Sequence, residues 1–520
     1  WLDKLPEEIL LSTLKEKYED ASATVPYVIT PIIGEYDRPS IQAQGLLKLD
    51  LLSKNTLIQG TNTSGLDEIL KTIIFSTCIE HTPEEVNFYL IDMGAESLRI
   101  FNKFPQVGDV CTIEDGDKIL NMLMIGENEI TRRKDIFADY SGDYKTYIES
   151  SNEKLPLLIF IINYYDVFQE NFAKIADALN TIFRDGPKYG VEYILTTNAG
   201  TMRYKIQEYF ENKICLQLAD KEQYRNILDA PRGLTPSTSL GRGLIPFSEE
   251  VLEFQTAFIS EKNNVNATIK KVGELLSARF TTRAPNVPVL PKIVSLKMVL
   301  ESVKSLSTLV IGYDIDTKDE LIFDFSKTKI TPILAANLRS QMNFIYALIE
   351  EIKSLGNVKL QIIDVENYVE FDKLNLVELY NRDFDGVFSR MYTDVTHPIE
   401  NIYNVYIITG IGKLKGKLNR DTVALYNSIF TYVDRLPNAF FIFADDYESY
   451  KMLQIESWYS KSIDSKNGIW LGTGVGTQIA ISFNKLSNDQ KRINIADVAF
   501  STSIDGQNHV LRKVITTEDE

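Results

Sequence analysis

The sequence predicts an α/β fold in which two tandem domains each form a mainly parallel sheet covered by helices. Apolar strands alternate with amphipathic helices along the chain. A proline-rich segment, residues 281–292, separates two series of such elements and is expected to be a linker. At 520 residues the chain is also too long for one ordinary core. We therefore expect a first domain over residues 1–282 and a second over residues 283–520.

The first half supplies strands and helices in regular alternation. Its strands are nearly continuous apolar runs, as is typical of parallel strands that are buried on both faces. The expected strands are residues 54–60, 86–94, 157–162 and 191–200. The expected helices are residues 66–81, 118–140 and 172–190.

The second half repeats this pattern. Its expected strands are residues 307–314, 321–326, 330–337, 358–367, 403–412 and 438–446, with a helix over 340–355. Landmarks can be paired in order: Asp37 with Asp314, Gly60 with Ala336, Asp92 with Asp364, and Asn163 with Thr409. "LGRGLI" (240–245) has a looser counterpart in "LGTGVG" (471–476). Several ordered matches indicate a tandem duplication of one α/β domain.

A candidate phosphate-binding loop follows the first expected strand of this alternation. In "LIQGTNTSGLDEIL" (57–70), Gly60 and Gly65 have the spacing of the motif G-x-x-x-x-G-K-[ST]. Such a loop binds phosphates through backbone N–H groups at a helix N-terminus. Leu66 stands where the lysine is needed, and Asp67 where the serine or threonine is needed. The residues between the glycines are Thr61, Asn62, Thr63 and Ser64.

Both departures weaken a nucleotide site. The loss of one charge-assisted hydrogen bond removes about 1.5–3 kcal/mol. A carboxylate at about 4 Å from a phosphate charge costs on the order of 4 kcal/mol at an effective dielectric of about 20. Mg²⁺ bound by Asp67 could partly offset this repulsion. We favour the simpler interpretation that Asp67 is a first-turn acid that stabilises the helix N-terminus.

The acidic pair that would hold Mg²⁺ and activate water is also missing. After the strand "LLIFII", Asn163 and Tyr164 stand where two acids are needed, and Asp166 is expected to be displaced. The second domain departs further, with Ala336 and Gln341 at the glycine positions. Weak ATP binding by the first domain, with or without Mg²⁺, stays open. We expect no nucleotide in the second domain and no catalytic residue in either.

Composition excludes several function classes. A formal net charge of −17 disfavours broad nucleic-acid binding, which needs clustered Lys and Arg. Three scattered cysteines and three histidines lack metal-ligand spacing, so no metal site is expected. No run approaches the length of a membrane span. The first residue is Trp1 and no signal peptide follows, so we expect a piece of a longer protein.

The order of these motifs resembles the FtsK/SpoIIIE translocase ATPases. The carriers are the loop at 57–65, the strand at 88–92, the helix with Arg132, Arg133 and Phe137, the strand at 157–163, Arg225, and the glycine turn at 241–243. The stretch "WLDKLPEEI" and a second, more degenerate module narrow the resemblance to the C-terminal ATPase modules of type VII secretion coupling proteins.

This resemblance implies two RecA/FtsK-like P-loop NTPase-type domains. It implies the cytoplasmic portion of a membrane-anchored motor that oligomerises and carries several such modules in series. The implied partners are small WXG-class helical-hairpin proteins with their export-signal tails, and other modules of the same motor. The last module is then a candidate substrate receptor. Arg225 and Arg242 become candidates for contacts between modules, with buried structural arginines as the alternative.

Four functional hypotheses follow. The leading one is that both modules are non-catalytic and bind export substrates or regulate an active module of the parent. In the second, the first module binds ATP as a regulatory nucleotide without hydrolysing it efficiently. The third is a DNA-translocating ATPase, which the charge and the broken loops disfavour. In the fourth, the duplicated fold serves only to oligomerise the parent.

Overall fold

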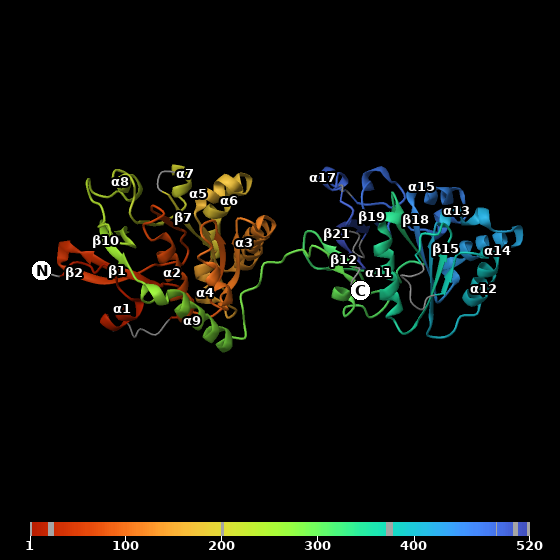
Figure 1. Ribbon diagram of the computed structural model, residues 1–520, viewed down its shortest axis with the longest axis horizontal. Helices are drawn as coiled ribbons and strands as arrows, with labels where there is room; N and C mark the ends of the chain where they lie inside the picture. The colour runs from red at the N-terminus through yellow and green to blue at the C-terminus, as the bar shows by residue number, and fades with distance from the viewer. Residues whose placement is uncertain are drawn as a thin grey trace. The chain divides into compact units, whose positions relative to one another are not determined.

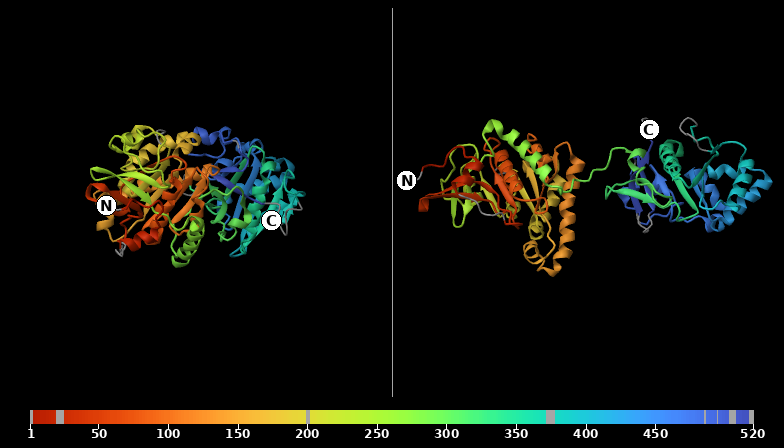
Figure 2. Two further views of the ribbon diagram at one scale, coloured as in Figure 1. Left: turned by 60° about the vertical axis from the view of Figure 1, so that its left-hand side comes forward. Right: turned by 90° about the horizontal axis from the view of Figure 1, so that it is seen from below.

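The chain forms two compact units, one ending at Val289 and the other beginning at Leu290 (Figures 1 and 2). The structure is a computed structural model that describes residues 3–18, 25–198, 202–370, 378–484, 486–493, 495–502 and 508–516. Each unit has its own sheet and its own cores. The units are therefore described one at a time.

The first unit is built on a 10-stranded sheet with the order β2-β1-β10-β9-β8-β3-β7-β6-β4-β5. The six strands from β8 to β5 are parallel, and the four from β9 to β2 are antiparallel. The strands are β1 (Ile32–Arg38), β2 (Ala43–Lys48), β3 (Thr56–Gln59), β4 (Val86–Asp92), β5 (Val107–Thr112), β6 (Leu157–Asn163), β7 (Val191–Thr197), β8 (Asn212–Cys215), β9 (Arg242–Phe247) and β10 (Glu250–Thr256). The candidate loop follows β3, in the middle of the sheet.

Helices cover both faces of this sheet, as Figure 1 shows. Successive strand residues point to opposite faces, so Leu57 and Ile58 belong to different apolar cores. One core includes α1, α2, α4 and α9, and the other includes α3, α5, α6 and α7. The helices are α1 (Leu11–Lys17), α2 (Leu66–Glu80), α3 (Gly116–Ile136), α4 (Tyr144–Ser150), α5 (Tyr165–Asn171), α6 (Ala173–Asp185), α7 (Tyr204–Gln207), α8 (Gln223–Leu228) and α9 (Val265–Arg279).

The second unit repeats the sheet strand for strand. Its order is β13-β12-β21-β20-β19-β14-β18-β17-β15-β16, and β11 (Val294–Ser295) pairs with β21 outside this path. The strands are β12 (Leu309–Asp314), β13 (Glu320–Phe323), β14 (Ile330–Ala335), β15 (Val358–Asp364), β16 (Glu378–Tyr380), β17 (Tyr403–Thr409), β18 (Ala439–Asp446), β19 (Ile469–Leu471), β20 (Val498–Thr502) and β21 (Asn508–Ile515). The predicted duplication is confirmed, because each strand has a partner at the same place in the other sheet.

The helices of the second unit also cover both faces of its sheet. One core includes α10 and α11, and the other includes α12 to α16. The helices are α10 (Leu296–Val299), α11 (Met342–Lys353), α12 (Phe384–Thr396), α13 (Ile411–Leu414), α14 (Arg420–Thr431), α15 (Tyr447–Tyr450), α16 (Tyr459–Ser462) and α17 (Asn488–Lys491). Among the described helices of either unit, none is long and apolar enough to cross a bilayer.

One of the expected pairings is wrong. "LGTGVG" (471–476) follows β19, which holds the place of β8, whereas "LGRGLI" (240–245) leads into β9. The strand equivalent to β9 is β20. The two glycine turns therefore come from different parts of the repeat, and their likeness in sequence is not inherited from one ancestral turn.

The first part of the proline-rich segment belongs to the first unit. Ala284 and Val287 are buried, the Ala284 amide donates to the Pro105 carbonyl at 2.7 Å, and the Tyr89 hydroxyl donates to Pro285 at 3.1 Å. These contacts place the segment against the end of the sheet formed by β5. The division between the units therefore falls after Val289 rather than at the expected boundary between residues 282 and 283.

Candidate nucleotide-binding site

The candidate loop lies where the sequence predicts it, between the end of β3 at Gln59 and the start of α2 at Leu66. Gly65 caps the helix with φ of 105°, in the left-handed region that favours glycine. Asn62 and Thr63 are exposed at the tip, whereas Gly60 and Gly65 are buried. The backbone path of a phosphate-binding loop is thus retained.

Packing within the protein accounts for both glycines. A Cβ at Gly65 would lie 2.7 Å from the Gly241 nitrogen and 2.9 Å from its Cα. A Cβ at Gly60 would lie 2.3 Å from the Ser64 hydroxyl. Because two backbone segments meet directly at Gly65 and Gly241, no larger residue fits there. The presence of these glycines therefore does not require a bound nucleotide.

The loop is closed on itself by Ser64. Its amide and its hydroxyl both donate to the Thr61 carbonyl, at 3.0 and 2.7 Å. The amides of Gly60 and Thr61 donate to carbonyls of neighbouring strand ends, Thr197 and Gln217. The amides of the first two loop residues and of Ser64 are therefore engaged within the protein.

The residue at the lysine position is part of the core. Leu66 is 1% exposed and belongs to the apolar cluster that packs around α2. A lysine there would point its ammonium toward the phosphate site, but a leucine contributes only apolar contact. The loop therefore has no side-chain cation at this position.

Asn163 joins the ends of three elements in one buried network. Its side-chain nitrogen donates to Asp67 Oδ1 at the start of α2 and to Asp92 Oδ1 at the end of β4, both at 3.0 Å. Asn163 itself is completely buried at the end of β6. The two hydrogens of one neutral amide thus bridge two carboxylates that face each other where an NTPase holds its metal.

The orientation of the Asn163 amide is fixed by Thr196 on β7. The Thr196 hydroxyl accepts from the Tyr164 amide at 2.8 Å, so its own hydrogen is free to donate to Asn163 Oδ1 at 2.6 Å. The nitrogen of the amide must then face Asp67 and Asp92. Asp92 also accepts from the backbone amides of Gly94 and Leu98, each at 3.0 Å. Its carboxylate oxygens are therefore both engaged.

Tyr164 covers the side of this network. Its backbone is left-handed, with φ of 59°, and its ring lies directly over Gly94, where a Cβ would come within 2.5 Å. Burial, followed by the negative charge of Asp67, raises the pKa of the Tyr164 hydroxyl to about 12. Asp166 accepts from Asn198 at 2.9 Å and so faces the end of β7. As expected, it is displaced from the position of a water-activating acid.

The two candidate arginines differ. Arg242 is 4% exposed, and its guanidinium donates to Gln255 at 2.8 Å and to the carbonyls of Leu5 and Pro6 at 3.0 and 2.9 Å. It therefore holds the N-terminal segment of its own unit in place, as expected of a buried structural arginine rather than of a contact between modules. Arg225 lies exposed on α8.

In the second unit, side chains fill the site. Gln341 holds the place of Gly65, and its carbonyl oxygen accepts from the ammonium of Lys513 on β21. Lys513 faces Gly312 as Thr256 faces Gly34, so Lys513 and Thr256 are equivalent. A long polar pair thus replaces the contacts of Gly65, Gly241 and Thr256. Burial lowers the pKa of Lys513 to about 8.

An internal carboxylate occupies the helix start of the second unit. After β14 the chain enters a short 3₁₀ turn, Leu338–Gln341, and the Leu338 amide donates to Asp446 Oδ1 at 2.5 Å. The Tyr368 hydroxyl donates to the other oxygen of Asp446 at 2.6 Å. Asp446 therefore binds a backbone amide where an active module would bind an anion.

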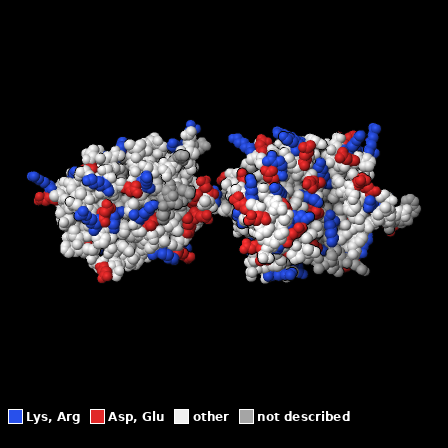
Figure 3. Space-filling view, turned by 180° about the vertical axis from the view of Figure 1, so that it is seen from behind, with Lys and Arg blue, Asp and Glu red and all other residues white. Residues whose placement is uncertain are grey.

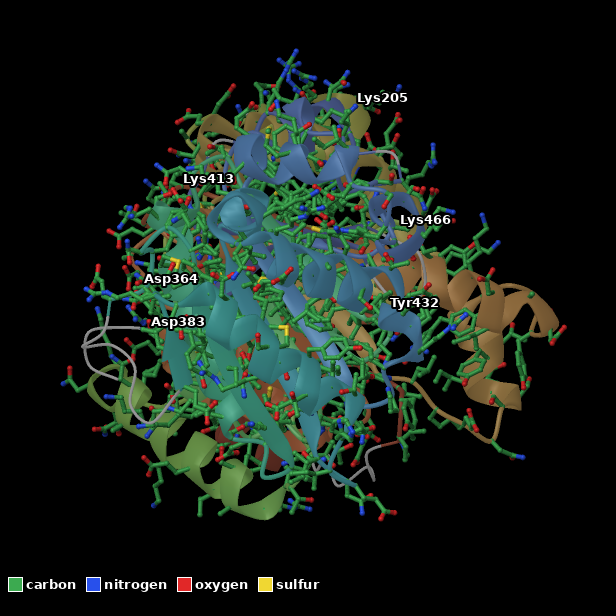
Figure 4. The ribbon with its side chains drawn as sticks, turned by 90° about the vertical axis from the view of Figure 1, so that its right-hand side faces the viewer. Lys205, Asp364, Asp383, Lys413, Tyr432 and Lys466 are labelled. Carbon is green, nitrogen blue, oxygen red and sulfur yellow. The ribbon has the colours of Figure 1, made fainter. Side chains whose placement is uncertain are left out.

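Acids at the strand ends of the second unit accept hydrogen bonds from groups of the same unit. At the end of β17, Thr409 donates to Asp364 Oδ1 at 2.7 Å (Asp364 is labelled in Figure 4). Asp445 accepts from the Gly412 amide at 2.8 Å and the Ser449 hydroxyl at 3.1 Å, and burial raises its pKa to about 7. Neutral donors thus face Asp364 and Oδ2 of Asp445, whereas Oδ1 of Asp445 is buried with no hydrogen-bond partner among the described residues.

Sequence reasoning missed four of these residues as parts of the sites. Asp92, Thr196 and Asp446 stand at or near the carboxyl ends of parallel strands, where ligand sites of α/β sheets gather. Their position at the strand ends is the sequence signal that could have identified these three residues. Lys513 lies on an antiparallel strand distant in sequence, and its contact with Gln341 follows only from the topology.

Charges are mixed on the face of the molecule seen in Figure 3. Lys and Arg side chains lie among Asp and Glu side chains on each unit there. Within the described parts of the chain, no group of three or more His, Cys, Asp or Glu side chains is arranged to hold a metal ion.

The fold and the loop after β3 are similar to those of α/β modules of the FtsK/SpoIIIE kind. The FtsK/SpoIIIE family model matches residues 14–232, within the first unit. The resemblance noted in the sequence is thereby confirmed.

Three relatives are proteins of ESX or type VII secretion systems. The chain is 26% identical over 336 residues to the ESX secretion system protein YukB of Bacillus subtilis, covering 61% of the chain and 22% of YukB. It is 24% identical over 274 residues to the ESX-1 secretion system protein EccCb1 of Mycolicibacterium smegmatis, covering 50% of the chain and 46% of EccCb1. It is 24% identical over 430 residues to the type VII secretion system protein EssC of Staphylococcus aureus, covering 75% of the chain and 28% of EssC. The chain thus matches less than half of each relative.

Solved structures share the two-unit fold. A fragment containing ATPases 2 and 3 of EssC from Geobacillus thermodenitrificans matches with a TM-score of 0.79 and 16% identity, covering 99% of this chain and 100% of that one. The corresponding fragment of Thermomonospora curvata EccC, in complex with a signal sequence peptide, matches with a TM-score of 0.54 and 16% identity, covering 96% and 95%. At this identity the likeness is one of fold.

Proposed function

We propose that both units are non-catalytic ATPase-like modules of a type VII secretion motor. The observation that carries the proposal is the Asn163 amide, which bridges Asp67 and Asp92 where an active module would hold Mg²⁺. A neutral amide cannot polarise a phosphate oxygen or activate water as a bound metal does. With Leu66 at the lysine position, neither charge needed for phosphoryl transfer is supplied.

The second unit supports the same conclusion independently. Gln341 and Lys513 fill its loop, and Asp446 binds the amide at its helix start. The two units lost the site in different ways, yet both kept the complete sheet. We infer that the fold is kept for binding rather than for hydrolysis.

The proposed partners are the export-signal tails of small WXG-class helical-hairpin proteins, together with other modules of the same motor. The EccC fragment that shares this fold carries a signal sequence peptide in its complex, which supports such a role. We place the two units in the cytoplasmic portion of a membrane-anchored parent that oligomerises. The second unit is our candidate receptor.

A binding experiment tests the receptor role. The whole chain is immobilised and exposed to a WXG-class protein encoded in the same genome, with and without its C-terminal tail. We expect retention of the intact protein and loss of binding when the tail is removed. Equal retention of both forms, or of neither, would contradict the receptor role.

A regulatory nucleotide in the first unit is the second candidate function. The glycine turn and the N-terminus of α2 are retained, which favours it. The bonds within the loop and the carboxylate of Asp67 oppose it. Titration calorimetry with ATP and Mg²⁺ tests this candidate. Binding heat at micromolar ATP would support a regulatory nucleotide site, and the absence of heat at millimolar ATP would exclude one.

A further inference from the structure

The first unit contains a cavity of about 620 Å³. It lies between the N-terminal segment, the first turns of α2, the turn before β9, and the segment that joins β10 to α9. Its volume is within the range of ligand sites, roughly 300–1,000 Å³. None of the network around Asn163 lines it.

The walls of the cavity are held in place by backbone pairing. The Leu11 amide donates to the Phe258 carbonyl at 2.9 Å, and the Phe258 amide donates to the Ile9 carbonyl at 2.8 Å. The Thr72 hydroxyl on α2 donates to the Ala257 carbonyl at 2.6 Å. Three segments that are distant in sequence are thus joined, so the cavity is formed before any ligand arrives.

The charged groups that line the cavity are mainly acidic. The carboxylates are Glu7, Glu8, Glu68 and Glu261, and the ammonium groups are Lys71 and Lys262. Counting the described residues only, none of these six side chains takes part in an ion pair or hydrogen bond. The cavity therefore has an excess of negative charge and unused hydrogen-bond acceptors.

Apolar and uncharged polar side chains provide the remaining surface. Leu10, Leu240, Phe258 and Ile259 line the cavity, and Leu240 is 38% exposed. The acidic groups disfavour an anionic ligand. A ligand with cationic ends on apolar stems fits both kinds of surface, as arginine and lysine side chains do.

We propose that this cavity binds a basic, partly apolar peptide segment of a protein partner. The apolar side chains would cover Leu240 and Phe258, and the guanidinium or ammonium groups would pair with the free carboxylates. The chain's net charge of −17 adds long-range attraction for such a partner. This site goes beyond the proposed loss of catalysis and does not depend on it.

The test uses the whole chain and a fluorescein-labelled, amidated peptide composed of arginine and leucine. Fluorescence anisotropy should show saturable binding that weakens as salt is raised. Copies of the peptide with glutamine or glutamate in place of arginine should bind at least about tenfold more weakly, a difference of about 1.4 kcal/mol. Binding of the glutamate copy as tight as that of the arginine peptide would overturn the proposal.

A matched pair of variants locates the site. The quadruple variant Glu7→Gln, Glu8→Gln, Glu68→Gln and Glu261→Gln should lose affinity for the arginine peptide by at least about tenfold. The control neutralises four exposed glutamates elsewhere on the same unit: Glu114→Gln, Glu149→Gln, Glu153→Gln and Glu170→Gln. Both variants change the net charge equally, so the control should retain affinity.

Two outcomes would contradict the site. Equal losses in the two quadruple variants would mean that the peptide responds only to overall charge. Displacement of the peptide by millimolar ATP with Mg²⁺ would mean that the cavity takes an anion after all. The peptide assay measures no hydrolysis, so either failure leaves the proposal of non-catalytic modules intact.

Discussion

Asn163 is the residue on which the functional interpretation depends. One amide satisfies Asp67 and Asp92 together, and Thr196 fixes its orientation. Two buried or half-buried carboxylates at one place would repel each other without a cation or a pair of donors between them. Asn163 therefore supports the fold at the position where the proposed function places the loss of catalysis.

Asn163→Asp should destabilise the first unit. The substitution removes both donors and adds a third carboxylate, which should lower the free energy of unfolding by about 3 kcal/mol. Urea unfolding of the chain, followed by hydrogen exchange of peptides from β4 and β6, measures this. The control Asn171→Asp changes an exposed asparagine, and its free energy of unfolding should stay within about 0.5 kcal/mol of that of the unchanged chain. Equal stability of the two variants would contradict the role given to Asn163.

Two buried acids predict a pH-dependent stability of the second unit. Burial raises the pKa of Glu351 on α11 to about 8 and that of Asp445 to about 7. Between their unfolded pKa values near 4 and these values, the folded state binds more protons than the unfolded state. Stability should therefore be greatest at low pH and fall as the pH rises from about 5 to about 8.

The second unit has its own optical probe for this prediction. Trp458 and Trp470 are buried in its core, so their fluorescence follows its unfolding. Glu351→Gln can still accept from the Val310 amide and should flatten the pH dependence. An unfolding midpoint of the second unit that rises between about pH 5 and about pH 8 would contradict the raised pKa values. So would a pH dependence of stability that is as steep in Glu351→Gln as in the unchanged chain.

At the scale of elements, the loop and helix α2 keep the geometry of a nucleotide site for structural reasons. The Gly65 cap touches Gly241, which joins the start of α2 to the turn before β9. In the second unit the same junction is filled by Gln341 and Lys513. The duplication thus offers two ways of packing one strand-to-helix turn.

Gly65→Ala and Gly233→Ala separate packing from backbone strain. Both glycines have positive φ, 105° and 84°, but a Cβ at Gly233 meets nothing within 4 Å. Gly233→Ala should cost only about 1 kcal/mol of backbone strain. Gly65→Ala should cost about 3 kcal/mol, because the methyl group also clashes with Gly241. Thermal unfolding without nucleotide measures both, and equal costs would refute the packing explanation.

At the scale of the whole molecule, the sequence predicted the parallel strands, their covering helices and the duplication. Strands such as β4 and β6 are apolar along their length and stand out. The antiparallel part was less visible in the sequence. Strands β8 and β19 are short, and the spacing between β19 and β20 differs from that between β8 and β9. The false match of 471–476 followed from this. The departures from the motif at Leu66 and Asn163 were readable in the sequence, but the bridge made by Asn163 follows only from the contacts.

The boundary between the units gives a further prediction. Residues 283–289 pack against the first unit at the end of its sheet. A fragment that ends at residue 282 should expose the β5 edge and aggregate more than one that ends at Val289. Light scattering at equal concentrations compares them. Identical solubility and melting temperature of the two fragments would contradict the assignment of this segment to the first unit.

ATP turnover by the whole chain with Mg²⁺, in the presence and absence of an export substrate, decides whether these modules are non-catalytic. We expect phosphate release no faster than in the protein-free control, because Leu66 supplies no cation for the phosphate and Asn163 supplies no metal site. A contaminating ATPase is distinguished by Thr63→Asp, which places a carboxylate at the exposed loop tip. Turnover well above the control that Thr63→Asp abolishes would contradict the claim that these modules are non-catalytic.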